Sequence, residues 1–183
     1  MDDIVKKALE KWPNVPDCYG WLALDQRGKW YMRDDRIQAQ GFFPHPKGSW
    51  LQHEKLIDFI GRNYQADELG RWYFQNGPQK VFVELETAPW VIRIQQFDDK
   101  EAVSFIFSTH TGQRITPEHF WEDEQGLVYV STKIGLGVVH SQDMLQVANA
   151  LESQFWDIQS LQNLQIENQF QFVKSPERQL KNR

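Results

Sequence analysis

The chain has 183 residues, of which 40% are hydrophobic and 25% are charged, so it can bury the core of one compact domain or of two small halves. Its net charge of -5 disfavours general binding to nucleic acid, because an acidic surface repels a phosphate backbone. The lone Cys18 excludes an intrachain disulfide and fits a reducing cytoplasm. No stretch has the length of a membrane span, and the first residues lack the pattern of a secretory signal. We therefore expect a cytoplasmic protein without a membrane partner.

Three helices are expected from apolar residues at helical spacing. The first covers residues 2–12 and is stopped by the prolines that follow it. The second starts at Ser49, which has the spacing of a capping box with Gln52, and runs through to Tyr64. The third is capped by Ser141.

Short runs of alternating apolar and polar residues predict strands. In chain order they are 21–24, 29–33, 71–75, 80–86, 90–95, 103–108 and 127–132. We expect loops over 34–48 and at Gly135-Leu-Gly137. The Gln-rich residues 152–173 are ambiguous, although alternating Phe170 and Phe172 suggest a last short strand. Residues 174–183 are expected to be a frayed tail.

A turn pattern, Asp-x-x-Gly followed by one residue, a bulky apolar residue and Tyr, occurs three times. The copies are Asp25-Gln-Arg-Gly28-Lys-Trp30-Tyr31, Asp67-Glu-Leu-Gly70-Arg-Trp72-Tyr73 and Asp123-Glu-Gln-Gly126-Leu-Val128-Tyr129. Asp first and Gly fourth is typical of a tight turn, in which Gly supplies a positive φ. We expect all three glycines in or beside turns between strands. Trp30 and Trp72 should project from equivalent strand positions into a buried layer.

The order hairpin, glycine-containing loop and Ser-capped helix occurs twice, which indicates an internal duplication. We expect an α+β fold with mostly antiparallel β-sheets in two related halves, each with one packed helix, plus a short N-terminal helix. The first half should cover residues 1–97 and the second 98–183, either as two halves or as one compact unit.

Five segments together resemble a family of small bacterial proteins without an established activity, and the likeness covers most of the chain. They are Trp12-Pro-Asn-Val-Pro16, Cys18-Tyr-Gly-Trp21, Trp30-Tyr-Met-Arg-Asp-Asp35, His53-Glu-Lys-Leu-Ile-Asp-Phe-Ile60 and Phe74-Gln-Asn-Gly-Pro78.

Two further segments, over roughly residues 20–150, are similar to a second bacterial family of unknown function. They are Glu86-Thr-Ala-Pro-Trp90 and Phe107-Ser-Thr-His-Thr-Gly112. This second resemblance implies repeated β-sheet-plus-helix motifs and a signalling role. The N-terminal helix of the present chain has no counterpart in that pattern.

The loop before the second helix is the best candidate for a ligand site. Free N–H groups at a helix start, the helix dipole and basic side chains together favour an anion. The expected ligand residues are Lys47, Gly48, Ser49, His53, Arg33 and Arg36. Simple helix capping is the alternative explanation of the same pattern.

No catalytic residue, metal site or cofactor is predicted. The 5 His lack the spacing of a zinc helix motif, and one Cys cannot build a thiolate site. The P-loop, the dinucleotide fingerprint and GxSxG are absent from the sequence. Asp34-Asp35 fits a charged loop, and Glu84 with Glu86 fits a solvated face of a sheet.

These features favour a non-enzymatic cytoplasmic module that binds a small anionic ligand or a protein partner, with a regulatory role implied by resemblance alone. A small enzyme of unrecognised type and an RNA-associated factor are the alternatives. A deep cleft with perturbed acids would favour the enzyme. A basic stripe with exposed rings would favour RNA, and an apolar surface patch would favour a protein partner.

Overall fold

The computed structural model describes residues 1–98 and 103–181, and its backbone forms two compact units. Unit 1 consists of Met1–Asp25, Lys29–Thr87 and the chain from Gln171 onward. Unit 2 consists of Gln26–Gly28 and Ala88–Phe170. The division therefore lies before the expected boundary at residue 97, and the last residues return to unit 1.

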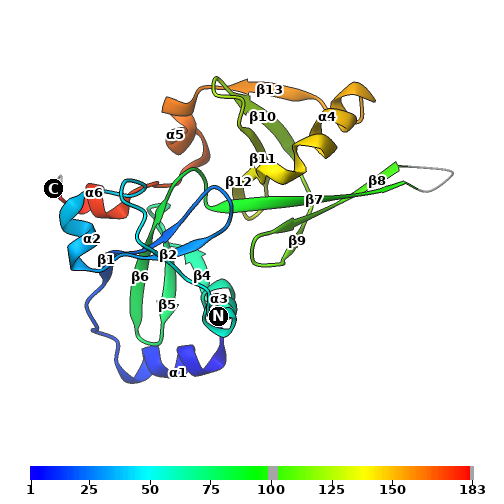
Figure 1. Cartoon of the computed structure of the whole chain (residues 1–183). Coiled ribbons are helices and arrows are strands. Elements are labelled where there is room, and N and C mark those ends of the chain that lie inside the picture. The colour runs from blue at the N-terminus through cyan, green and yellow to red at the C-terminus, as the bar shows by residue number, and fades with distance from the viewer. Residues whose placement is uncertain (99–102, 182–183) are drawn as a thin grey trace. The chain divides into compact units, whose positions relative to one another are not determined.

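Unit 1 holds a six-stranded sheet in the order β3-β2-β1-β6-β5-β4 (Figure 1). The strands are β1 (Cys18–Leu24), β2 (Trp30–Met32), β3 (Ser49–Trp50), β4 (Tyr64–Ala66), β5 (Trp72–Asn76) and β6 (Gln79–Leu85). The helices are α1 (Asp3–Lys11), α2 (Asp35–Gln40), α3 (Glu54–Arg62) and α6 (Pro176–Lys181). The central strands β1 and β6 are parallel, and the other neighbours are antiparallel.

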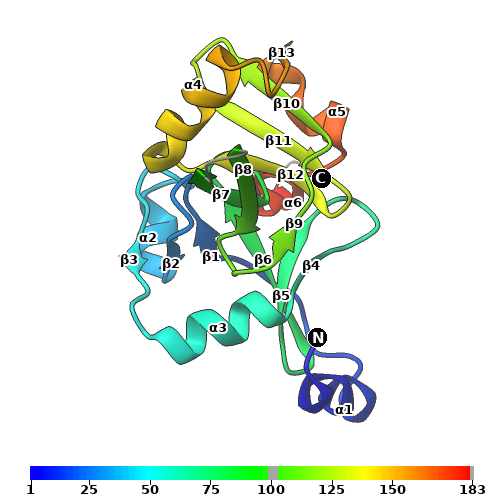
Figure 2. The same ribbon diagram turned by 90° about the vertical axis from the view of Figure 1, so that its right-hand side faces the viewer.

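Unit 2 holds a seven-stranded sheet in the order β13-β10-β11-β12-β7-β8-β9, and Figure 2 shows β10, β11 and β12 side by side. The strands are β7 (Trp90–Asp98), β8 (Val103–Thr109), β9 (Arg114–Ile115), β10 (His119–Asp123), β11 (Val128–Thr132), β12 (Gly135–Val139) and β13 (Ile158–Leu161). The helical segments are η1 (Ser141–Asp143), α4 (Met144–Glu152), η2 (Asn163–Gln165) and α5 (Ile166–Phe170).

The two sheets have the same topology. Apart from the added β13, strands β7 to β12 take the places of β1 to β6, and the parallel pair β7 and β12 corresponds to β1 and β6. This confirms an α+β fold of two similar halves with a short N-terminal helix. The helices enter the repeat at different points, because α3 follows β3 whereas α4 follows β12.

The three predicted turns are confirmed. Gly28, Gly70 and Gly126 lie between paired strands with φ values of 76°, 74° and 78°. One oxygen of each Asp accepts the N–H of the residue four positions later, at 2.9 Å: Lys29 on Asp25, Arg71 on Asp67 and Leu127 on Asp123. Each carboxylate therefore closes its hairpin by replacing a backbone partner.

The second oxygen of each turn carboxylate also has a partner. The hydroxyls of Tyr31 and Tyr129 donate to Asp25 and Asp123 at 3.1 and 2.9 Å. In the middle copy, Nε of Arg71 donates to Asp67 at 2.7 Å instead. The Tyr of the pattern is thus a hydrogen-bond partner of the turn in two of its copies.

Four local expectations were wrong. Ser49 belongs to β3, where it pairs with Met32, and α3 begins at Glu54 with His53 as its cap. Gly135-Leu-Gly137 is strand β12, because the hairpin turns earlier, where the Thr132 hydroxyl donates to the carbonyl of Gly135 at 2.7 Å. The expected loop contains α2, and Phe170 ends α5 rather than a strand.

The expected frayed tail is also ordered as far as the structure describes it. The N–H of Val173 donates to the carbonyl of Gly70 at 2.9 Å, and the N–H of Leu85 donates to that of Lys174 at 2.8 Å. Helix α6 follows and packs against β6 and β1. The sequence pattern does not predict this order, because the partners of the segment lie about a hundred residues earlier in the chain.

Trp30 and Trp72 lie in one buried layer of unit 1, as predicted. They are 1% and 7% exposed, and both rings contact the ring of Tyr64 at centroid distances of 5.3 and 4.8 Å. Helix α3 extends this layer, because Phe59 packs edge-on against Phe74. The aromatic rings that follow the turns therefore form the core of unit 1.

Replacing Trp30 with Ala should lower the free energy of unfolding by about 3–5 kcal/mol, because the cavity is enclosed by rings that cannot collapse into it. Urea titration followed by circular dichroism measures this loss. Trp12→Ala is the matched control, since Trp12 is 52% exposed and should cost under about 1 kcal/mol. Equal losses in the two variants would contradict this assignment of the core.

Candidate functional site

The structure separates the residues of the predicted anion site from a helix start. Ser49 is exposed in β3, and His53 uses its Nδ1 to accept the N–H of Leu56 at 3.2 Å. Gly48 has a φ of 100° and lies against the backbone of Met32. Glycine is therefore required here by the backbone conformation and the close approach of Met32. These three residues therefore build a strand and a cap instead of a cradle for an anion.

The basic residues of that site point to different partners. Nζ of Lys47 lies 2.8 Å from Glu86 and 3.5 Å from Asp25. Arg33 is fully buried, with Nη1 3.5 Å from Glu177. Arg36 is exposed on α2. The structure consequently brings Lys47 and Arg33 to separate carboxylates.

The contacts of Lys47 argue against proton chemistry at this position. Partial burial acts to lower the pKa of Lys47, but the carboxylates of Glu86 and Asp25 outweigh it and raise that pKa. Burial and Asp25 likewise raise the pKa of Tyr31. Both groups therefore keep their protons at neutral pH, and neither can act as a general base.

Glu84 lies in a second polar cluster on the sheet of unit 1, where it was expected to face solvent. Its side chain is 1% exposed because the C-terminal segment covers it. It accepts hydrogen bonds from the hydroxyl of Ser175 and from the N–H of Glu177, the latter at 3.0 Å. Burial raises the pKa of Glu84 to about 7. Since both oxygens have partners, the cluster holds the C-terminal segment rather than a substrate.

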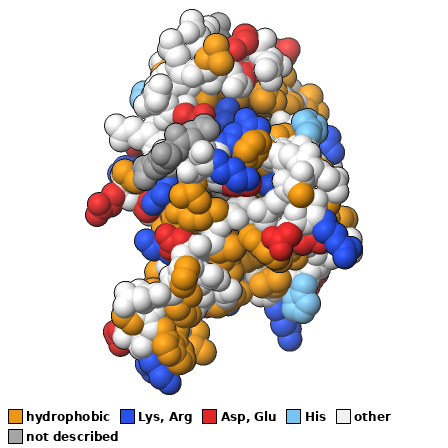
Figure 3. Space-filling model, turned by 90° about the vertical axis from the view of Figure 1, so that its left-hand side faces the viewer, with side chains coloured by type: hydrophobic (Ala, Val, Ile, Leu, Met, Phe, Trp, Pro, Cys, Tyr) orange, Lys and Arg blue, Asp and Glu red, His pale blue; other side chains and the backbone are white. Residues whose placement is uncertain are grey.

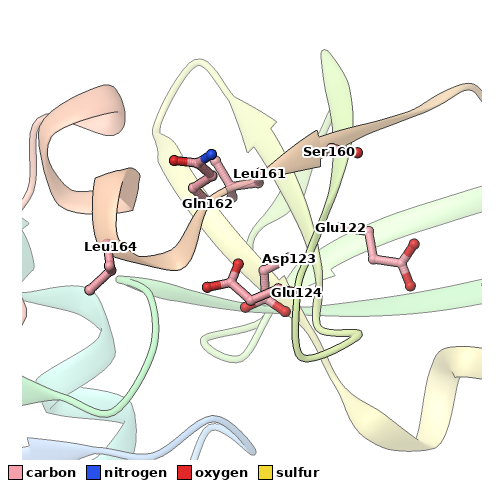
Figure 4. Close-up of a pocket in the computed structure, with 7 residues that line it drawn as sticks. All are labelled: Glu122, Asp123, Glu124, Ser160, Leu161, Gln162 and Leu164. Atoms are coloured by element: carbon pink, nitrogen blue, oxygen red, sulfur yellow. The ribbon is translucent and has the colours of Figure 1, made fainter.

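An acidic hollow of about 570 Å³ lies in unit 2 beside the ends of β10 and β13 (Figure 4). Asp123 is committed to its turn and to Asn163, whose Nδ2 donates to it at 2.9 Å. Glu124 accepts the N–H of Asn163 at 3.0 Å, and Glu122 points away from these two carboxylates in Figure 4. In the part of the chain that the structure describes, no three His, Cys, Asp or Glu converge as a metal site.

A groove of about 610 Å³ follows β8 in unit 2 and is the best candidate site. Five consecutive residues of β8, from Val103 to Phe107, line it. A pocket over one face of a strand would be lined by alternate residues, because successive side chains point to opposite faces. The consecutive run therefore indicates that the groove borders the backbone edge of β8.

The edge of β8 is open because its outer neighbour is very short. Every residue of β8 has a partner in β7, whereas β9 pairs only with Phe107 and Ser108. Figure 1 shows β8 extending well beyond β9. Pro117 follows β9 closely and lacks the N–H that a continued ladder would need. Within the described residues, no strand consequently pairs with the outer side of residues 103–106.

A fourth copy of the tight turn positions β9. Thr109 takes the place of Asp, and its Oγ1 accepts the N–H of Gln113 at 3.2 Å. Its own N–H donates to the carbonyl of Gln113 at 2.9 Å, and Gly112 has a φ of 82°. Because Thr stands here in place of Asp, this turn lies outside the Asp-x-x-Gly pattern of the other three copies.

Aromatic side chains form the wall of the groove. Trp156 stacks on Phe120 at a centroid distance of 4.4 Å and also contacts Phe105 at 4.6 Å. Phe155 lies next to Phe105 and is 53% exposed, and Val103 is 37% exposed. Anchored rings beside exposed apolar ones are suited to receiving apolar side chains. The adjacent Phe155 and Trp156 are the sequence signal that could have indicated this wall.

The remaining surface carries mixed charge. On the face drawn in Figure 3, Lys and Arg side chains are interspersed with Asp, Glu and hydrophobic ones. Among the described residues, none of the helices has the length and apolar character needed to cross a membrane.

Replacing Glu84 with Gln should remove a pH dependence of stability. The pKa of about 7 lies above the ordinary Glu value of 4.5, so the folded chain binds this proton more tightly than the unfolded chain. The contribution to stability is therefore present below about pH 4.5 and is lost as pH rises through about 7, by up to about 3 kcal/mol. Urea titrations at pH 5 and pH 8 measure it.

In that experiment the variant should lose less stability than the natural protein between the two pH values. Glu68→Gln is the control, because Glu68 is exposed in a turn. Parallel pH profiles for the natural protein and Glu84→Gln would show that this carboxyl does not titrate as the structure indicates.

Comparison with solved structures gives a fold relationship. The chain is similar to the crystal structure of a DUF1285 family protein from Silicibacter pomeroyi DSS-3, with a TM-score of 0.52 and 14% identity over 81% of this chain and 84% of that chain. At this identity the likeness concerns the fold alone. No curated protein matches the sequence.

A family model supplies the assignment that the fold alone cannot. The model is named DUF2944, is described as "Protein of unknown function (DUF2946)", and matches residues 1–183. The expected resemblance to families of unknown function is thus confirmed. Because this model spans the whole sequence, the chain belongs to the DUF2944 family of unknown function.

Proposed function

We propose that this protein is a non-enzymatic binding module that takes an extended segment of a protein partner along the open edge of β8. The observation that carries this proposal is the groove lined by five consecutive residues of that strand. An added strand would pair with the unused backbone groups of residues 103–106, and its side chains would meet the aromatic wall. Main-chain pairing would give affinity, and the wall would favour apolar side chains.

The composition of the edge supports the proposal. Proteins usually protect open strand edges with Lys, Pro or an inward-pointing charge. Residues 103–106 read Val-Ser-Phe-Ile and have none of these. An uncharged edge beside exposed apolar side chains readily pairs with another chain, so this edge is suited to receiving an added strand.

The alternatives find less support in these units. Glu84, the carboxyl whose pKa is raised to about 7, belongs to unit 1, whereas the residues that line the groove belong to unit 2. Within the described part of the chain, Arg114 is the single basic residue that lines the groove, which offers little to an RNA backbone. We also propose a cytoplasmic location, which rests on the lone Cys18, and a regulatory role, which rests on resemblance alone.

A fluorescein-labelled peptide tests the proposal. The probe is Thr-Val-Phe-Val-Phe-Thr with fluorescein on its N-terminal amine and an amidated C-terminus, and the control probe has Pro in place of its second Val. We expect saturable binding of the first probe by fluorescence anisotropy, and at least about tenfold weaker binding of the second, because Pro cannot complete the strand ladder.

Two variants locate the binding. Phe155→Ala should weaken the binding of the first probe by about tenfold, as for an exposed aromatic side chain that becomes buried on binding. Leu145→Ala is its matched control, because Leu145 is 68% exposed on α4 and does not line the groove. Equal binding of both peptides, or no effect of Phe155→Ala, would contradict the proposed mode.

A further inference from the structure

We infer that the segment received by β8 carries a carboxylate at the end nearest β9, where Arg114 binds it. This inference rests on the proposed function and names the chemistry of the partner more narrowly: an apolar extended stretch of about four residues that ends beside one negative charge. Four residues match the length of the open edge, residues 103–106, which spans about 13 Å.

Of the described residues that line the groove, Arg114 is the one that carries a charge. It is exposed in β9, opposite Ser108 of β8, and therefore marks the closed end of the open edge. A segment that continues the path of β9 along residues 106 to 103 begins next to this guanidinium. The arrangement places a positive charge at one end of an otherwise uncharged site.

The guanidinium of Arg114 is available to a ligand. Three other arginines are each paired with a carboxylate: Arg62 with Asp2, Arg71 with Asp67 and Arg93 with Asp143. The guanidinium of Arg114 has no hydrogen bond or ion pair to any residue within 1–97 and 103–181. Glu118 and Lys133 line a neighbouring hollow of about 270 Å³ with it, and their charges balance each other. A planar guanidinium with five free donors is suited to a carboxylate.

The carboxylate can come from two sources, which imply different strand directions. A segment parallel to β8 ends beside Arg114, so its C-terminal carboxylate would be the charged group. A segment antiparallel to β8 begins there, so an Asp or Glu side chain near its start would be required. Both sources present the same charge to the same guanidinium, and matched peptides distinguish them.

Four labelled peptides with the same Val-Phe-Val-Phe core test the inference. Two differ only in a free or an amidated C-terminus, and two differ only in an N-terminal Glu or Gln. We expect one of the acidic peptides to bind about three- to fivefold more tightly than its neutral match at low salt, as for an exposed ion pair, and the preference to fade at high salt.

Arg114→Gln should abolish that preference and leave the neutral peptides unchanged. Lys133→Gln and Arg36→Gln are the controls, the first for nearby charge and the second for net charge. Equal binding of acidic and neutral peptides, or a preference that survives Arg114→Gln, would overturn the inference while the binding mode itself stands. If none of the four peptides binds, the proposed function fails as well.

Analytical ultracentrifugation tests whether a second copy of this chain, instead of a separate segment, pairs with the edge of β8. We expect the free protein to remain monomeric at the concentrations used for binding. A dimer that Val103→Lys dissociates would show that β8 pairs with its own copy, and this result would overturn the proposal of a separate acidic segment.

Discussion

The carboxylate of the tight turn is the interaction on which both sheets depend. In three hairpins a half-buried or buried Asp accepts the N–H of the residue just before the second strand, and the second oxygen of each Asp has a partner as well. For Asp123, burial alone would raise the pKa, but the hydrogen bonds outweigh it and lower that pKa. The charged form is therefore the one that the fold uses, and it fixes the register of each hairpin.

The same turn determines where the candidate site lies. Thr109 replaces Asp at the fourth turn and places β9 against the last residues of β8. Pro117 then prevents β9 from extending, so residues 103–106 of β8 are left without a described strand on their outer side. The anchored turn and Pro117 together thus leave the edge of β8 exposed next to a wall of aromatic rings.

Features that depend on neighbours in the sequence were predictable. The positive φ of Gly28, the buried Trp30 and the duplicated strand pattern follow from turn chemistry and alternation. Features that depend on distant partners were not. Ser49 has the spacing of a cap, yet pairing with Met32 draws it into a strand. Glu84 alternates like a solvent-facing residue, yet the C-terminal segment buries it.

The candidate site shows the same division. The strand over 103–108 was predicted, but its open edge could not be, because alternation describes the faces of a strand and says nothing about its edges. The basic cluster around Lys47 looked like an anion site because carboxylates that are distant in sequence, Asp25 and Glu86, were not seen as its partners. Charge read along the chain therefore cannot show which basic side chains are paired with a carboxylate in the fold.

Residue-resolved amide exchange by NMR tests the central claim, that β8 has an unpaired edge in the free protein. The amides of residues 103–106 that point away from β7 should exchange rapidly, whereas that of Val138 in β12, which has a strand on each side, should exchange slowly. Adding the apolar peptide should slow the rapid ones. Slow exchange at all four positions in the free protein would contradict the account, because it would mean that the edge is already covered.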